Sequence, residues 1–168
     1  MSVETTETLH LSDTRIAPAL ELVWREAHLL DRKAYEEWDR LWAPGGLYVI
    51  PIDSDTEDFE STLNMVYDDD RMRRMRIERL TSGYSISVDA AARTVRTLSR
   101  FVIQRYDEET VELSSAQVLV GHRREVTFVL GADVTHRIRL DAPEPLIVKK
   151  VVRLINSSDA VNASGFLL

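Results

Sequence analysis

The chain has 168 residues, of which 44% are hydrophobic and 29% are charged, a composition typical of one soluble globular domain. Its formal net charge of −7 argues against general nucleic-acid binding, because such binding needs a basic surface that displaces counterions. The absence of cysteine excludes a cysteine-ligated iron–sulfur cluster and thiol catalysis within this sequence.

The amino-terminal residues are polar, and we expect a flexible arm over residues 1–12 followed by a single domain over residues 13–168. The arm has neither the basic nor the apolar segment of a signal peptide. No stretch approaches the roughly 18 apolar residues that a membrane span needs. These features predict a cytoplasmic protein without membrane contact.

Two helices are predicted in the first quarter of the domain. Asp13 is the expected N-cap of the first, in which apolar residues recur at helical spacing over residues 16–30. Asp31 can end this helix and cap a short second one over residues 35–42, which the Pro-Gly-Gly sequence at 44–46 would stop. Three tryptophans are expected to be core anchors rather than a ligand site: Trp24, Trp38 and Trp42.

The next segment predicts a strand, a turn region and a third helix. Residues 47–52 are strand-like, and residues 53–64 are acidic and turn-like. The carboxylates at 68–70 can cap a helix over residues 71–81, in which arginines alternate with apolar residues. We interpret the arginines as a solvated helix face, with binding of phosphate or an acidic partner as the alternative.

The remainder of the chain has the pattern of β-strands. Helices followed by consecutive long strands indicate an α+β domain with a curved antiparallel sheet. Gly131 is expected to form a bulge in one of them. The predicted strands are residues 84–88, 94–106, 111–121, 125–140 and 146–156.

Four segments carry a resemblance to a known family. They are Glu21–Asp31, Tyr35–Leu41, Tyr67–Arg71 with the arginine-rich helix that follows, and Lys149–Asn156 with the closing Phe166–Leu168. Together with the order of elements, they resemble the cone-shaped fold of nuclear transport factor 2 and its relatives. Within that NTF2-like superfamily, the chain most resembles the beta (small) subunit of Rieske-type aromatic-ring-hydroxylating dioxygenases. Arg96 stands where that family usually has a histidine.

The resemblance implies a structural rather than a catalytic chain. In this family a separate alpha subunit holds the Rieske 2Fe-2S cluster and the mononuclear Fe(II), and the beta subunit carries no cofactor. The beta chain forms a trimer and organises the alpha subunits into an α3β3 assembly that hydroxylates an aromatic compound with O2. By the same resemblance, the candidate interface residues are Tyr67, Asp68, Asp69, Asp70, Arg71, Arg96, Lys149 and Lys150.

The residues leave two other functions open. The four histidines match no metal-binding spacing, and we interpret them as surface or structural residues: His10, His28, His122 and His136. Asp31 and Tyr48 could instead form an acid/base pair inside the cone of a stand-alone dehydratase or isomerase. An N-cap aspartate and an outward tyrosine are the simpler interpretation. The third possibility is a small-ligand binding module without chemistry.

Overall fold

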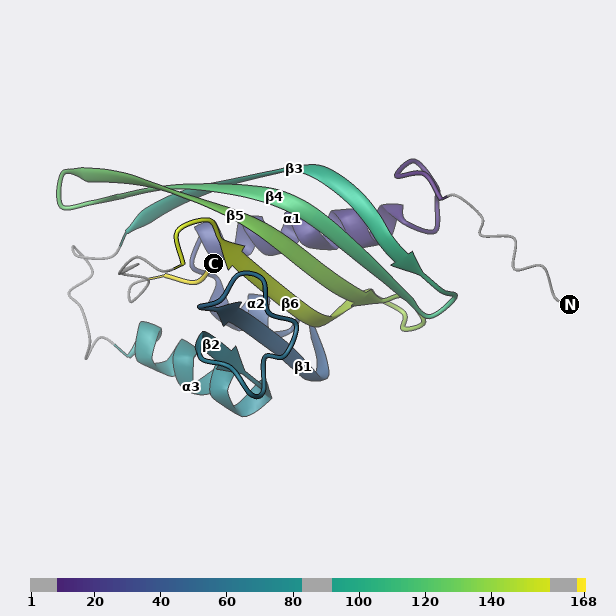
Figure 1. Cartoon of the computed structure of the whole chain (residues 1–168), viewed down its shortest axis with the longest axis horizontal. Coiled ribbons are helices and arrows are strands. Elements are labelled where there is room, and N and C mark those ends of the chain that lie inside the picture. Colours follow the sequence, from purple (N-terminus) through teal and green to yellow (C-terminus); the bar gives the residue numbers. More distant parts are fainter. Residues whose placement is uncertain (1–8, 83–91, 158–165) are drawn as a thin grey trace, which may run out of the picture.

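The fold is known from a computed structural model that describes residues 9–82, 92–157 and 166–168. Within these residues the chain forms three helices and six strands, and the last four elements are all strands (Figure 1). In chain order they are α1 (Ala17–Asp31), α2 (Tyr35–Asp39), β1 (Trp42–Pro51), β2 (Asn64–Asp68), α3 (Asp70–Thr81), β3 (Arg93–Tyr106), β4 (Thr110–Arg123), β5 (Val126–Arg139) and β6 (Leu146–Leu154).

All six strands belong to one sheet in the order β2-β1-β6-β5-β4-β3. Every pairing is antiparallel except that between β1 and β6, which is parallel. Figure 1 shows the long β3, β4 and β5 as a twisted ribbon with α1 along one face. The predicted α+β class is therefore confirmed, with a mixed sheet in place of a purely antiparallel one.

The core lies between the helices and the inner face of the long strands. Alternate residues of β4 and β5 point into it, and Leu113, Leu119 and Val134 are at most 1% exposed. Trp38 packs edge to face against Trp42, with ring centroids 5.5 Å apart. Both are core residues, as predicted.

Trp24 is not a core residue, contrary to the prediction, because 51% of it is exposed. The buried stripe of α1 runs through Ala19, Leu22, Val23 and Glu26, a path that leaves Trp24 at its edge. There its ring meets Phe101 edge to face. The prediction was wrong because Trp24 adjoins the buried Val23 and was counted as part of the apolar stripe of α1.

Helix α3 is held by arginine side chains as well as by the buried Ile77. Asp69 caps it by accepting a hydrogen bond from the Met72 amide at 2.9 Å, which confirms a predicted cap. Arg73 is 2% exposed and lies over the Trp42 ring, 4.2 Å from its centroid. Arg76 pairs with the buried Asp68. The solvated-face interpretation therefore holds for only part of this helix.

Three other local predictions differ from the structure. Asp13 is not the N-cap of α1, because Ile16 occupies that position and the Asp13 carboxylate binds Arg15 instead. Gly131 pairs regularly with Val118, so it forms no bulge in the ladder between β4 and β5. Strand β2 falls partly within the predicted turn region. The expected strand at residues 84–88 lies outside the described residues.

Candidate functional site

A cluster of charged side chains lies buried between α1 and the inner face of the sheet. Glu26 projects from α1, and its Oε1 accepts hydrogen bonds from Trp38 Nε1 at 3.0 Å and from Lys150 Nζ at 2.9 Å. Its Oε2 lies 2.6 Å from Nε2 of His136 on β5. Glu26, His136 and Lys150 are each at most 2% exposed. One carboxylate therefore joins α1 to α2, β5 and β6.

The pairing fixes the charge state of Glu26. Burial alone would raise the pKa of its carboxyl, but Lys150, His136 and Trp38 together hold that pKa below its usual range. Burial lowers the pKa of Lys150, because the loss of hydration outweighs the attraction of Glu26. Glu26 is thus an ionised carboxylate whose two oxygens are already occupied, an arrangement that suits a structural brace better than a proton acceptor.

Asp31 anchors α1 to β3 instead of capping α2. Its carboxylate accepts hydrogen bonds from the Thr94 hydroxyl at 2.9 Å, from the Arg96 amide at 2.8 Å and from the Arg96 guanidinium. The N-cap residue of α2 is Ala34, which provides no side-chain cap. The expected capping role of Asp31 is therefore wrong, because its carboxylate is bound by three donors of β3.

Tyr48 does point into the fold, and burial raises the pKa of its phenol. Its hydroxyl lies 3.0 Å from both the main-chain oxygen and the main-chain nitrogen of Leu168, donating to the first and accepting from the second. Among the hydrogen bonds of the described residues, none joins Tyr48 to Asp31. The two members of the predicted acid/base pair instead bind different parts of the chain. Asp31 binds β3, and Tyr48 binds Leu168.

The predicted interface residues fall into two groups. Asp68, Arg96 and Lys150 are 1%, 8% and 1% exposed, so the structure does not place them on the surface. They turn inward because Arg76, Asp31 and Glu26 pair with them inside the chain.

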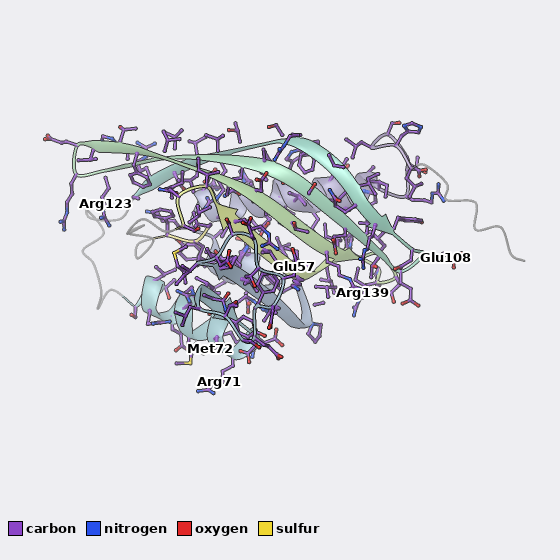
Figure 2. The ribbon with its side chains drawn as sticks, viewed as in Figure 1. Glu57, Arg71, Met72, Glu108, Arg123 and Arg139 are labelled. Atoms are coloured by element: carbon purple, nitrogen blue, oxygen red, sulfur yellow. The ribbon has the colours of Figure 1, made fainter. Side chains whose placement is uncertain are left out.

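The other five members of that set are at least partly accessible: Tyr67, Asp69, Asp70, Arg71 and Lys149. Figure 2 shows Arg71 and its neighbour Met72 projecting from α3 away from the sheet. The interface role of these accessible residues stays a prediction.

The outer face of the sheet carries an apolar surface of its own. Val95, Val120 and Val129 lie directly opposite one another on three neighbouring strands and are 66%, 42% and 62% exposed. Val118 lies two residues before Val120, and Ile155 covers the adjacent Gly131. We call these five residues the outer apolar patch. Contiguous exposed apolar side chains of this kind mark interaction surfaces.

Within residues 9–82, 92–157 and 166–168, no group of three or more His, Asp or Glu side chains is arranged to hold a metal ion. His28 is exposed, and His122 lies 2.8 Å from the Thr127 hydroxyl. No helix within the same ranges is long and apolar enough to cross a membrane.

A sequence profile described as the ring-hydroxylating beta subunit matches residues 25–158. The chain belongs to this family. The match spans all six strands and all but the first turns of α1, so it covers the Glu26 cluster and the whole outer apolar patch. Members of the family are beta subunits of dioxygenases, which implies association with an alpha subunit.

Solved structures show the same NTF2-like fold. The beta subunit of benzoate 1,2-dioxygenase from Burkholderia mallei is 18% identical, with a TM-score of 0.74 over 94% of this chain and 100% of that one. Naphthalene 1,2-dioxygenase gives 19% identity and a TM-score of 0.67 over 90% and 84%. A scytalone dehydratase-like protein from Novosphingobium aromaticivorans gives 11% and 0.62 over 83% of each chain. No curated protein sequence matches.

The sequence contained a signal for the Glu26 cluster that we did not use. Glu26 is four residues after Leu22 and three before Leu29, so it sits within the apolar stripe of α1. A carboxylate in such a position has to meet a buried cation or donor. The partners His136 and Lys150 are more than 100 residues away in the sequence, so no residue near Glu26 indicated that they would bind it.

Proposed function

We propose that this chain is the non-catalytic structural subunit of a multicomponent aromatic-ring-hydroxylating dioxygenase in the cytoplasm. It forms a trimer and holds catalytic alpha subunits in register in an α3β3 complex. The alpha subunits carry the Rieske 2Fe-2S cluster and the mononuclear Fe(II) and hydroxylate an aromatic compound with O2. Membership of the beta subunit family is the observation that carries this proposal.

The outer apolar patch supports an assembly role. Three valines in register on adjacent strands, with Val118 and Ile155 beside them, offer a preformed hydrophobic surface on a rigid sheet. Burying such a surface against a partner is favourable by about 25 cal/mol per Å2 of apolar area. The surface lies on β3, β4 and β5, away from the buried charged cluster.

The state of the interior supports the same proposal over a stand-alone enzyme. A dehydratase or isomerase would need an acid/base pair facing a substrate. Here the Asp31 carboxylate is held by Thr94 and Arg96, and Glu26 by Lys150 and its neighbours. These groups are positioned to stabilise the fold.

Expression of the chain with and without its alpha subunit tests the proposal. Purified alone, the chain should contain no stoichiometric iron and should not turn over an aromatic substrate. Expressed together, the two chains should co-purify at an equal ratio. Stoichiometric metal in the isolated chain, or an isolated-chain activity that the Asp31→Ala variant abolishes, would contradict the proposal.

A further inference from the structure

A polar hollow of about 260 Å3 lies on the outer face of the sheet and shares no residue with the outer apolar patch. Its floor is a row of side chains that the strand register places opposite one another: Ser114 on β4, Thr135 on β5 and Val151 on β6. Because side chains alternate along a strand, this row faces away from His136 and Lys150 of the inner face. We call this space the outer hollow.

The loop between β1 and β2 forms one wall of the outer hollow. Phe59 of this loop is 5% exposed and packs on Val151. Arg153 on β6 holds the loop in place, because its guanidinium donates to two main-chain oxygens of the loop at 2.7 and 2.8 Å. It also pairs with Glu57, which is labelled in Figure 2, at 2.7 Å. The wall is therefore fixed by the fold before any ligand binds, which lowers the entropic cost of binding.

Two cations of the outer hollow have no carboxylate partner. Arg137 on β5 and Lys149 on β6 lie directly opposite each other. Neither forms an ion pair with another described residue. Lys149 instead lies over the Phe59 ring, with Nζ 4.7 Å from the ring centroid, which keeps the ammonium beside the hollow. Like charges opposite each other on neighbouring strands destabilise a sheet, and an anion between them removes that cost.

The charge balance of the outer hollow selects the kind of anion. Glu57 neutralises Arg153. Glu112 also lines the hollow and lies opposite Arg137, but without a contact of ion-pair length. Two unpaired cations against one unpaired carboxylate leave a single positive charge, in a protein whose formal net charge is −7. That charge matches the one negative charge of a carboxylate better than the two charges of a phosphate.

The hydroxyls of the floor can donate hydrogen bonds to such an anion. Ser114 Oγ accepts a hydrogen bond from Gln104 Nε2 at 2.8 Å, which leaves its own proton free to donate. No side-chain hydrogen bond among the described residues uses the Thr135 hydroxyl. Two hydroxyl donors and two cations thus border one space. Charge-assisted hydrogen bonds from donors of this kind are the strong contacts that bind oxyanions.

We propose that the outer hollow is a binding site for a carboxylate, which Arg137 and Lys149 hold together with the Ser114 and Thr135 hydroxyls. The carboxylate belongs either to a small acid in solution or to an Asp or Glu side chain of a partner protein, since both present the same group to the hollow. The proposal does not rest on the assembly role, because the chain alone should bind a free carboxylate.

An NMR titration of the full-length chain with sodium acetate tests the proposal. At low ionic strength, acetate should shift the amide resonances of Thr135 and Arg137 saturably, with a Kd on the order of millimolar. Sodium chloride at matched ionic strength should not produce these shifts, and inorganic phosphate should bind no more tightly than acetate. The absence of a saturable shift at these residues, or tighter binding of phosphate, would overturn the proposal.

Two substitutions in the outer hollow should change the affinity in opposite directions, an outcome that a loss of folding cannot produce. Arg137→Gln removes a cation and should weaken acetate binding by about tenfold. Glu112→Gln removes the opposing carboxylate and should strengthen acetate binding by about threefold. Arg25→Gln is the matched control, because Arg25 is an exposed arginine of α1, on the other side of the sheet. Equal affinity of the unaltered chain and both hollow variants would overturn the proposal.

Expression with the alpha subunit distinguishes the two sources of the carboxylate. If the partner supplies it, Arg137→Glu should weaken assembly by about tenfold or more, whereas Arg25→Glu should assemble normally. Normal assembly of an Arg137→Glu chain that no longer binds acetate assigns the outer hollow to a free acid. Both results support the proposal. Failure of the unaltered chain to assemble at all would contradict the assembly role and leave the acetate titration to decide the carboxylate site.

Discussion

The two faces of the sheet each carry an exception to the usual pattern of apolar groups inside and polar groups outside. The inner face buries Glu26, His136 and Lys150 against one another. The outer face leaves Val120 and Val129 uncovered at 42% and 62% exposure. The inner groups pair with one another within the single chain, whereas the outer valines remain exposed to water. We therefore expect the inner face to hold the fold together and the outer face to bind a partner.

The largest effect is expected from removal of the Glu26 carboxylate on the inner side of the sheet. Glu26→Ala leaves the Lys150 ammonium, the Trp38 N–H and His136 buried without their acceptor. Loss of one partner of a buried ion pair costs about 3–5 kcal/mol, so this variant should lose that much free energy of unfolding in urea. A loss below about 1 kcal/mol would show that the cluster does not brace the fold.

The second prediction concerns the outer face and should leave folding intact. Val129→Lys places a charge in the outer apolar patch and should weaken assembly with the alpha subunit or with further copies by about a hundredfold. Its own unfolding free energy should change by no more than about 0.5 kcal/mol. Analytical ultracentrifugation and urea unfolding measure the two effects.

Val126→Lys is the matched control for that prediction. Val126 lies on the same strand and is equally exposed, at 63%, but three residues along the strand it has the opposite facial parity. It should assemble normally. Equal loss of assembly in the two lysine variants would contradict the assignment of the interface to the outer apolar patch.

The third prediction concerns the part of the pH dependence of stability that Glu26 contributes. The folded-state pKa of Glu26 lies below its unfolded value near 4.5, so its stabilisation is complete above that value and is lost as the pH falls further. The unaltered chain should lose up to about 1.4 kcal/mol per pH unit from this group in acid, and Glu26→Gln should lack that component. Parallel stability–pH curves for the two proteins would refute the assignment.

The smallest expected effect is at the cap of α3. Asp69→Ala removes the acceptor for the Met72 amide and should reduce the unfolding free energy by about 1 kcal/mol. Asp69→Ser retains an acceptor and should restore most of the loss. Thermal unfolding of the three proteins compares them, and a neutral Asp69→Ala would mean that the arginines of α3 hold the helix without its cap.

Local pattern was enough to predict the elements that repeat regularly. The stripe of α1 and the alternation of β3 to β6 reflect one buried face each, so the α+β class followed from them. The Asp69 cap was visible for the same reason, since its partner Met72 is three residues away. Trp24 shows the limit of such patterns. It follows the buried Val23, and an apolar stripe drawn one position too wide includes it.

Long-range pairing explains what could not be predicted. Glu26 meets Lys150 across 124 residues, and Tyr48 meets Leu168 across 120, so no local window contains either contact. Asp31 is a residue type typical of helix caps. It binds β3 instead, because the Arg96 amide of that strand lies next to its carboxylate. Pairing with Asp31 and Glu26 likewise explains why Arg96 and Lys150 turn inward, although the family resemblance had suggested them as interface residues.

The mass of the native complex, isolated from cells that express both chains, tests the assembly role most directly. The account predicts a particle with equal numbers of the two chains, three of each, with this 19.2-kDa chain in every particle. A stable single chain of 19.2 kDa that never associates with an alpha subunit would contradict it.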